Sequence, residues 1–166
     1  DIDPNRAKEQ VKSVSEVVRE GIQDVRGSLN RLRPGALEGR TLKDALEKMI
    51  REYQTLSNLQ VDLHYEWVDV DMDVMIEDTI FRVIQESMTN AVRHGHASQM
   101  SLHFFEDEED YLIELQDNGV GFETLTYGYG LKQMMERISI LGGQLQFESR
   151  DGFFTCVSLP KYKEGR

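Results

Sequence analysis

The sequence has few of the features that mark disulfide-bonded, exported or membrane-spanning proteins. Its 166 residues include one cysteine, Cys156, which excludes an intramolecular disulfide and a cysteine-rich metal site and suits a reducing compartment. No run of about 18 or more apolar residues occurs, and the N-terminus lacks the basic-then-apolar pattern of an export signal. We therefore expect a cytoplasmic domain without membrane contact, any membrane anchor lying outside this chain. Cys156 is expected to be a core residue of a strand.

Acidic residues outnumber basic ones. Lys and Arg number 19 against 30 Asp and Glu, which gives a formal net charge of -11. Because contacts to nucleic-acid phosphates need clustered basic side chains, this balance argues against direct nucleic-acid binding. A small anionic ligand would need local donors and a metal ion to offset the negative field. The length of 166 residues suits one domain, or one domain with a helical appendage, and the 39% hydrophobic content is enough for a packed core.

Residues 1–35 are predicted to form one long helix of a helical bundle. Apolar residues recur there at spacings that sum to seven, at Val11, Val18, Ile22, Val25, Leu29 and Leu32. Val14 and Val17 widen this stripe, which favours a four-helix bundle and hence a partner helix from another segment or from a second copy of the chain. Pro34 and Gly35 should end the helix, so we predict a domain boundary between 1–35 and 36–166.

The second predicted domain alternates helix and strand patterns. Thr41 and Asp44 should start a helix whose apolar stripe runs from Leu42 to Tyr53, and a second helix is predicted over 74–93, ended by a left-handed Gly95. A third helix, opened by Gly130, has its apolar face at Leu131, Met134, Met135, Ile138 and Leu141 and ends at Gly142-Gly143. Strand patterns cover 61–67, 100–104, 111–116, 145–147 and 153–159. We predict an α+β fold, a two-layer α/β sandwich in which three helices cover one face of a mainly antiparallel sheet.

Three alternating acids, Asp69, Asp71 and Asp73, precede the 74–93 helix. A calcium-binding loop would also need a central glycine and a glutamate at its twelfth position, and both are missing. We interpret the segment as a solvated turn that caps the helix and assign no metal to it.

Two polar motifs point to a ligand site. Glu86, Asn90 and the Arg93-His94 pair recur at helical spacing, so they share one face of the 74–93 helix. In Asp117-Asn118-Gly119-Val120-Gly121, an acid ends a strand and two glycines let the backbone approach a flat or anionic group. Each motif alone has an ordinary explanation, a solvated helix side or a turn. Together they predict a nucleotide site.

The order of these motifs resembles the ATP-binding domain shared by sensor histidine kinases, gyrase, the Hsp90 chaperone and MutL, the Bergerat fold. A helix with Glu86 and Asn90, two strands, the Asp117 loop, and then Gly128-Tyr129-Gly130-Leu131 opening another helix carry the resemblance. The segment from Leu32 to Leu46 is similar to the junction between bundle and ATPase domain in histidine kinases that pair with NarL-type response regulators. The resemblance implies ATP and Mg²⁺ as ligands, a homodimer formed through the helix bundle, and a NarL-type response regulator as partner.

The resemblance also implies a role for each motif residue. Asn90 would bind Mg²⁺, Glu86 would orient or deprotonate the attacking group, and Asp117 would accept a hydrogen bond from the exocyclic amine of adenine. The other implied contacts are Arg93 and His94 at the phosphates, Gly119 and Gly121 at the base and ribose, Gly128, Gly130 and Leu131 at a short lid, and Thr155 at adenine through water. His94 has an alternative role as a cation at the helix C-terminus.

Two features depart from the family pattern. Phe154-Thr155 stands where the family usually carries Gly-Thr, and none of the four histidines, His64, His94, His96 and His103, lies in residues 1–35. We therefore predict a sensor histidine kinase catalytic domain that transfers the ATP γ-phosphate to a histidine on an upstream helix absent from this chain, for relay to a response regulator. The alternatives are an anti-sigma-type serine kinase and a non-catalytic, ATP-gated interaction module.

Overall fold

The computed structural model describes residues 37, 39–68, 70 and 72–161. The chain divides into two compact units, residues 1–38 and 39–166. The predicted bundle helix at 1–35 lies outside the described residues, as do Asp69 and Asp71 of the acidic turn. Within the described part of the chain, no helix has both the length and the apolar character needed to cross a bilayer.

In the described residues, three helices and five strands follow one another along the second unit. They are α2 (Leu42–Leu56), β1 (Gln60–Tyr65), α3 (Val74–Arg93), β2 (Gln99–Glu106), β3 (Asp110–Asp117), α4 (Tyr129–Ile140), β4 (Gln144–Ser149) and β5 (Phe153–Pro160). The predicted bounds of the central helix, 74–93, are confirmed at both ends. Helix α4 begins at Tyr129, one residue before the predicted opening at Gly130.

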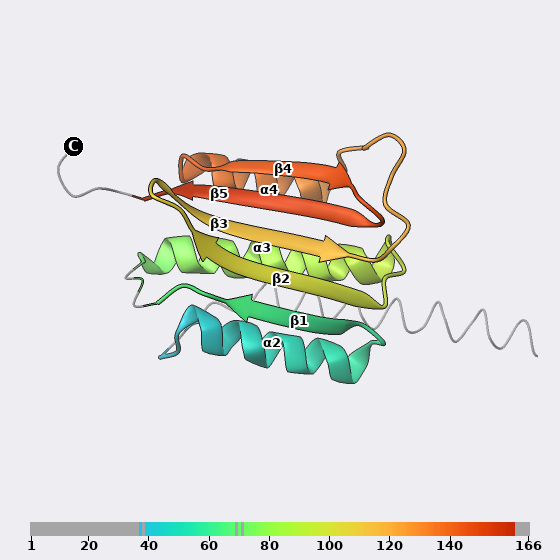
Figure 1. Ribbon diagram of the computed structural model, residues 1–166, viewed down its shortest axis with the longest axis horizontal. Helices are drawn as coiled ribbons and strands as arrows, with labels where there is room; N and C mark the ends of the chain where they lie inside the picture. Colours follow the sequence, from blue (N-terminus) through green and yellow to red (C-terminus); the bar gives the residue numbers. More distant parts are fainter. Residues whose placement is uncertain (1–36, 38, 69, 71, 162–166) are drawn as a thin grey trace, which may run out of the picture. The chain divides into compact units, whose positions relative to one another are not determined.

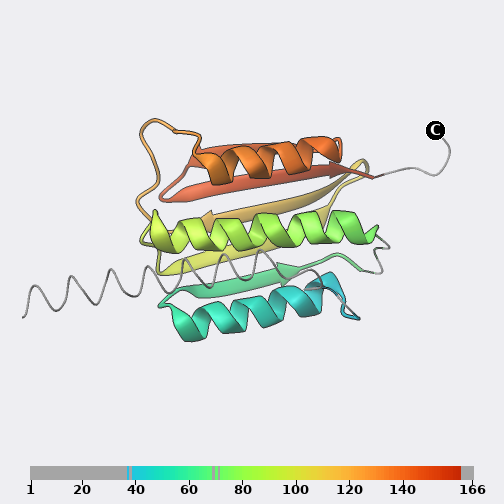
Figure 2. The same ribbon diagram turned by 180° about the vertical axis from the view of Figure 1, so that it is seen from behind.

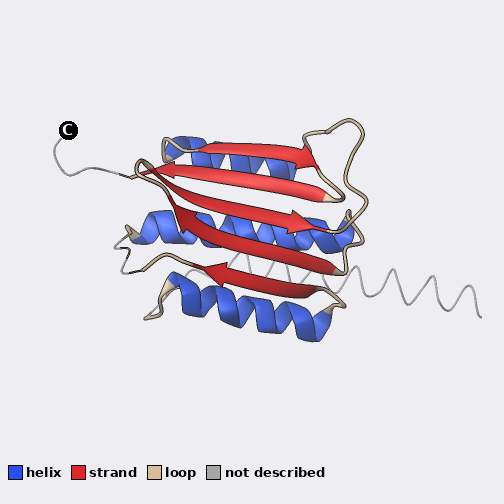
Figure 3. Cartoon of the chain, viewed as in Figure 1, coloured by secondary structure: helices blue, strands red, loops and turns tan. Residues whose placement is uncertain are grey.

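The five strands form one mixed sheet in the order β1-β2-β3-β5-β4. β1 and β2 are parallel, because α3 crosses between them, and the other three pairings are antiparallel. Figures 1 and 2 show the sheet from its open face and from behind, where α2, α3 and α4 cover it. Figure 3 shows the same division into a helix layer and a strand layer, which confirms the predicted two-layer α+β sandwich.

The core lies between the helices and the sheet. Alternate residues of the inner strands face the helices and are almost fully buried, among them Leu102, Phe104, Ile113, Leu115 and Val157. They meet an apolar stripe on the helices that includes Leu46, Ile80, Ile84, Met88 and Ile138. The period of two in the strands and of 3.6 in the helices therefore produces the layered core that the sequence patterns predict.

Side-chain caps fix the starts of the first two described helices. Thr41 Oγ1 accepts a hydrogen bond from the Asp44 amide at 3.2 Å, as the predicted helix start requires. Asp73 Oδ1 accepts one from the Met75 amide at 2.7 Å, so this part of the acidic turn does cap α3.

The end of α3 differs from its prediction. His96, with φ of 50°, adopts the left-handed conformation that was expected of Gly95. Gly95 is required for space instead, because a Cβ added there would lie 2.8 Å from the Ala91 carbonyl oxygen. A polar side chain such as histidine tolerates the left-handed region better than most, so the turn forms without glycine at that position.

Three further residues also differ from their predictions. Met135, expected on the apolar face of α4, is 37% exposed because Met134 and Ile138 occupy the buried side of the helix. Trp67 is buried as expected but follows the end of β1 instead of lying in it. Cys156 is half-buried on the open face of the sheet, where burial and the neighbouring Glu114 raise the pKa of its thiol.

Candidate functional site

A cavity of about 380 Å³ lies between α3, α4, the sheet and the loop of residues 118–128. This volume falls within the usual range for small-molecule pockets. The predicted site residues in its wall are Glu86, Asn90, His94, Asp117, Gly121, Gly128, Gly130, Leu131 and Thr155. The fold therefore brings together the helix motif (Glu86, Asn90 and His94), the loop motif (Asp117 and Gly121), the start of α4 and one residue of β5.

Two predicted site residues do not belong to the described cavity wall. Arg93 lies in the last turn of α3, beside the wall residue His94, and Gly119 lies within the loop, where it packs against the Gly95 backbone. The wall also contains residues that the sequence did not single out: Ser87, Gly95, Met100, Leu115, Phe122, Thr124, Leu125, Thr126, Tyr129, Met134 and Phe153. Most of these are apolar or adjoin a predicted residue. Ser87 lies one helical turn before Asn90, and Leu115 and Phe153 lie two residues before Asp117 and Thr155 on their strands, so the helix and strand periods could have found these three. The loop residues carry no such signal.

Asp117 is the carboxylate at the floor of the cavity. Its side chain is only 6% exposed, and its Oδ1 accepts hydrogen bonds from the amides of Gly119 at 2.8 Å and Phe153 at 3.1 Å. These two donors stabilise a buried charge and fix the orientation of the carboxylate. Among the described residues no donor is bonded to Oδ2, so this oxygen is free to accept a hydrogen bond from a ligand.

The loop that carries Asp117 is attached to β2 through Asn118. Its Oδ1 accepts hydrogen bonds from the amides of Ser98 and Gln99, both at 2.9 Å, and its Nδ2 donates to Ser98 Oγ at 3.0 Å. The Asn118 amide donates to the Gln99 carbonyl at 3.1 Å. Asn118 is therefore a structural residue that fixes where the chain leaves the end of β3.

The same loop packs directly on the end of α3. The Val120 amide donates to the Gly95 carbonyl at 3.0 Å, and a Cβ added at Gly119 would overlap that carbonyl oxygen. Two glycine backbones thus touch at the point where the loop motif meets the helix motif. This contact determines how far Asp117 lies from Asn90.

Aromatic rings join the rest of the loop to the β4–β5 hairpin. Phe122 lies 5.3 Å from Phe153, Phe153 lies 5.5 Å from Phe147, and Phe147 lies 6.4 Å from Tyr127, measured between ring centroids. The Phe122 amide also donates to Ser149 Oγ at 3.1 Å. Both ends of the 122–127 segment are therefore held against the hairpin, and its middle forms one wall of the cavity.

Gly121 needs its glycine for two reasons. It has a φ of +60°, and an added Cβ would lie 2.5 Å from Ser149 Oγ and 2.8 Å from the Gly152 carbonyl oxygen. Only glycine satisfies both the conformation and the space.

The opposite end of the cavity is polar. Glu86, Asn90 and His94 present one face of α3 to it, and the side chain of Asn90 makes no hydrogen bond to the described residues. Gly128 caps α4 without a side-chain bond, so the first amides of α4 lack internal acceptors and can bind an anion. A Cβ at Gly130 would overlap the Glu86 carboxylate, which shows how closely α4 approaches α3 here.

Phe154 does not disturb the cavity. It pairs with Gln116 and Glu148 on the open face of the sheet, where the Arg150 guanidinium covers its ring at 4.0 Å from the centroid. Thr155 points the other way, is 2% exposed and belongs to the cavity wall. Because neighbouring strand residues alternate in direction, the large side chain at 154 leaves the position of Thr155 intact.

The donor set fits a magnesium ion held together with phosphates. Among the described residues, no group of three His, Cys, Asp or Glu side chains could hold a metal by itself. Mg²⁺ typically takes few protein oxygens and keeps water and substrate phosphates as its other ligands. One amide oxygen at Asn90, near the free amides of α4, matches that arrangement.

Comparisons with known proteins identify the family of the chain. A family model described as "Histidine kinase-, DNA gyrase B-, and HSP90-like ATPase" matches residues 75–163. The signal transduction histidine-protein kinase/phosphatase UhpB of Salmonella typhimurium is 35% identical over 147 residues, which cover 85% of this chain and 29% of UhpB. The sensor histidine kinase LiaS of Bacillus subtilis is 30% identical over 158 residues, which cover 93% of this chain and 43% of LiaS. The chain thus spans less than half the length of these curated relatives.

A similarity to solved structures supports the fold. The Acinetobacter baumannii histidine kinase AdeS matches with a TM-score of 0.64 at 19% identity, covering 98% of this chain and 87% of that structure. At this identity the likeness concerns the arrangement of helices and strands.

The contact between Gly119 and Gly95 gives a prediction about stability. Gly119→Ala should lower the free energy of unfolding by about 1 to 3 kcal/mol, the usual cost of overpacking, because the new methyl group meets a backbone carbonyl. Urea denaturation measures the change. Val120→Ala is the matched control, since that side chain is 74% exposed and its loss should change stability by less than about 0.5 kcal/mol. Equal unfolding midpoints for Gly119→Ala and the parent protein would contradict the close contact.

Proposed function

Because the chain belongs to the family of histidine kinase-, DNA gyrase B- and HSP90-like ATPases, we propose that its cavity binds ATP·Mg²⁺ and serves phosphoryl transfer to a histidine. Relatives named sensor histidine kinases put this ATP-binding domain in the histidine-kinase branch of the family. The observation that carries the proposal is the geometry of Asp117. Its carboxylate is buried at the cavity floor, fixed by two backbone donors through one oxygen, and open to a ligand through the other.

We propose that adenine lies against the floor of the cavity. The exocyclic amine would donate to Asp117 Oδ2, Thr155 would reach the base through water, and the loop at Gly119 and Gly121 would pass close to base and ribose. Apolar side chains around this floor, among them Met100, Leu115 and Phe153, would exclude water from the base. Guanine has no amine at the corresponding position and would leave Asp117 without a donor.

The phosphates would then extend toward the polar end of the cavity. The free amides at the start of α4, at Gly130 and Leu131, would bind phosphate oxygens. Gly128, whose own amide donates to the Thr126 carbonyl at 3.0 Å, would lie beside them in the short lid. Asn90 would hold Mg²⁺, which would offset the charge of the phosphates when bound. Arg93 and His94, at the end of α3, would place two basic side chains nearby, although the cavity wall contains only His94 of the two.

Glu86 is the proposed catalytic residue. It lies one helical turn before Asn90 on the same face of α3, and its carboxylate touches Gly130 at the start of α4. A carboxylate in this position could orient an incoming imidazole and accept its proton while the γ-phosphate is transferred. Positioning and charge stabilisation account for most of the catalysis in phosphoryl transfer, so the rigid spacing of α3 and α4 matters as much as the base.

Membership of this family also suggests a domain arrangement and partners for the intact protein. We propose that residues 1–35 supply one helix of a dimerisation bundle and residues 36–166 the catalytic domain. The acceptor histidine would lie on an upstream helix, and the phosphoryl group would pass to a NarL-type response regulator. Cytoplasmic location of the domain is part of the proposal. An anti-sigma-type serine kinase is the less favoured candidate, because the named relatives are histidine kinases.

Asp117 should determine the affinity for adenine nucleotides. A hydrogen bond to a charged acceptor contributes about 1.5 to 3 kcal/mol, so Asp117→Asn should raise the Kd for ATP roughly 10- to 150-fold. Isothermal titration calorimetry measures both proteins. GTP should compete poorly with ATP in the parent. Equal ATP affinity in the variant would refute the assignment of Asp117, as would GTP competing as well as ATP.

Asn90 should couple nucleotide binding to magnesium. Asn90→Ala is expected to remove the Mg²⁺ dependence of ATP binding while affinity for ADP, supported mainly by the base, changes little. Titrations with and without Mg²⁺ measure the difference. A variant that keeps the parent's magnesium dependence would exclude Asn90 as the metal ligand.

The acceptor should be a histidine on another segment. Incubated with γ-labelled ATP, this chain should bind nucleotide but acquire no label, because its histidines lie at the cavity, in a turn or on strands. Addition of a protein that carries the family's acceptor helix should give an acid-labile, histidine-linked label on that protein. An acid-stable label on a partner's serine would support the serine-kinase alternative, and an acid-labile label on this chain alone would contradict the missing-acceptor argument.

A further inference from the structure

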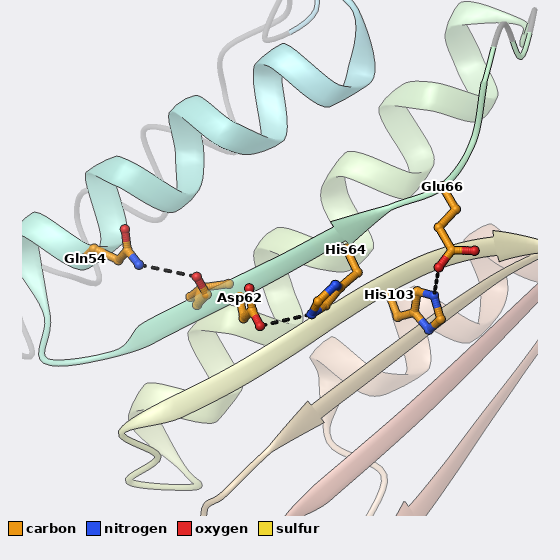
Figure 4. Close-up of polar contacts among 6 residues, drawn as sticks. Gln54, Asp62, His64, Glu66 and His103 are labelled. Atoms are coloured by element: carbon orange, nitrogen blue, oxygen red, sulfur yellow. Dashed lines mark hydrogen bonds and ion pairs between the residues drawn. The ribbon is translucent and has the colours of Figure 1, made fainter.

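A pair of histidines lies on the open face of the sheet, opposite the nucleotide cavity. His64 of β1 and His103 of β2 are direct partners in the parallel register, so their side chains leave neighbouring strands on the same face. Their ring centroids are 6.0 Å apart, and the rings meet nearly edge to face. Figure 4 shows the two imidazoles beside each other above the strands.

Each imidazole is held by its own carboxylate. His64 Nε2 donates to Asp62 Oδ2 at 2.9 Å, and His103 Nε2 donates to Glu66 Oε1 at 2.8 Å. The four side chains are accessible: His64 is 60% exposed and His103 38%, while Asp62 and Glu66 are more exposed still. No lysine or arginine among the described residues pairs with Asp62 or Glu66, so both carboxylates are available to orient the histidines.

This is the arrangement that prepares an imidazole to bind a metal. A metal-binding histidine commonly donates one ring N–H to a carboxylate, which fixes the tautomer and leaves a lone pair on the other nitrogen. With Nε2–H bonded to a carboxylate, Nδ1 carries that lone pair. Neither Nδ1 is bonded to any of the described residues, so two lone pairs stand on adjacent rings.

We propose that His64 and His103 together bind one divalent transition-metal ion, such as Zn²⁺, in an exchangeable site on the open face of the sheet. Two imidazoles on one tetrahedral zinc, with Zn–N distances of about 2.0 to 2.1 Å, place their ring centroids about 5 Å apart. The observed 6.0 Å is close to this value. In the metal-bound form, side-chain rotations would bring the two Nδ1 atoms onto one ion. Water would complete the coordination, since the described residues offer no third ligand in place.

The charge around the pair favours a cation. Asp62 and Glu66 adjoin the histidines, and Glu114 is the register partner of His103 on the next strand. The whole chain has a formal net charge of -11, which adds a long-range attraction for cations. Imidazole nitrogen prefers zinc, nickel and copper to magnesium, so this site and a magnesium ion held by Asn90 would not compete for the same metal.

Calorimetric titration of the nucleotide-free chain with ZnCl₂ tests the site, ATP being left out because it chelates the metal. One ion per chain should bind saturably. His64→Ala and His103→Ala should each abolish this binding, and Asp62→Asn or Glu66→Gln should weaken it roughly 10- to 100-fold, as loss of an outer-shell partner does. His96→Asn is the control, because His96 is exposed near the cavity, asparagine accepts its left-handed backbone, and the amide is a poor zinc ligand. Binding that survives in His64→Ala, or that is lost in His96→Asn, would overturn the proposal.

A second measurement on the parent protein needs no variant. Paramagnetic Cu²⁺ added in substoichiometric amounts should first broaden the nuclear magnetic resonance signals of residues 62–66 and 101–105. Broadening centred on residues 94–96 would contradict the site, and so would the absence of any selective broadening. Thermal unfolding of each variant separates loss of a ligand from loss of the fold, and neither measurement depends on the proposed kinase activity.

Discussion

The backbone contact between Gly119 and Gly95 is the constraint on which the candidate site depends. At this point the loop after β3 packs against the end of α3, with the Val120 amide bonded to the Gly95 carbonyl at 3.0 Å. A side chain on Gly119 would separate the two segments, because its Cβ would overlap the Gly95 carbonyl oxygen. The spacing of these two segments sets the distance between Asp117 and Asn90, the residues that we propose to bind the base and the metal. The nucleotide's length must match this spacing, so the contact links the fold to the proposed chemistry.

The hydrogen bonds around Asp117 extend the same constraint across the sheet. Phe153 at the start of β5 donates to its carboxylate, and Asn118 ties the loop to the start of β2. Ring contacts of Phe153 with Phe122 and with Phe147 pack the loop against the β4–β5 hairpin. The cavity is thus assembled from segments far apart in the sequence, and each is fixed by a backbone or ring contact of its own.

Alternation along the strands separates two surfaces with different chemistry. Side chains such as Met100, Leu115, Asp117 and Thr155 face the helices and supply the core and the cavity floor. The residues between them face solvent, where polar groups, the half-buried Cys156 and the histidine pair lie. Because the helices cover only one face, metal binding on the open face would leave the nucleotide cavity accessible.

Much of the fold could be predicted from the sequence because its local signals agree. The capping pattern at Thr41, the helical period over 74–93 and the glycines at 142 and 143 each define an element boundary that the structure confirms. The candidate site residues were also recognisable, since Glu86, Asn90 and Asp117 are polar residues in apolar contexts, although their binding roles remain predictions.

What the sequence could not predict are features that arise from contacts between distant segments. The left-handed residue after α3 is His96 and not Gly95, whose carbonyl accepts the Val120 amide and so links this turn to the loop. The bonds from Asn118 to Ser98 and Gln99, and the Arg150 guanidinium that covers Phe154, depend on strand register. The pairing of His64 with His103 depends on it too, because β1 and β2 are neighbours only after α3 crosses the sheet.

The central claim is that the free oxygen of Asp117 recognises the exocyclic amine of adenine. Its most direct test measures the binding of two nucleotides to two proteins. The nucleotides are ATP and purine riboside triphosphate, which lacks only that amine, and the proteins are the parent and Asp117→Ala. In the parent, calorimetry should show ATP binding roughly 10- to 150-fold more tightly than the analogue, as expected for a hydrogen bond to a charged acceptor. In the variant the two nucleotides should bind alike. The same preference for ATP in both proteins would contradict the account, because the amine would then be recognised by some other group.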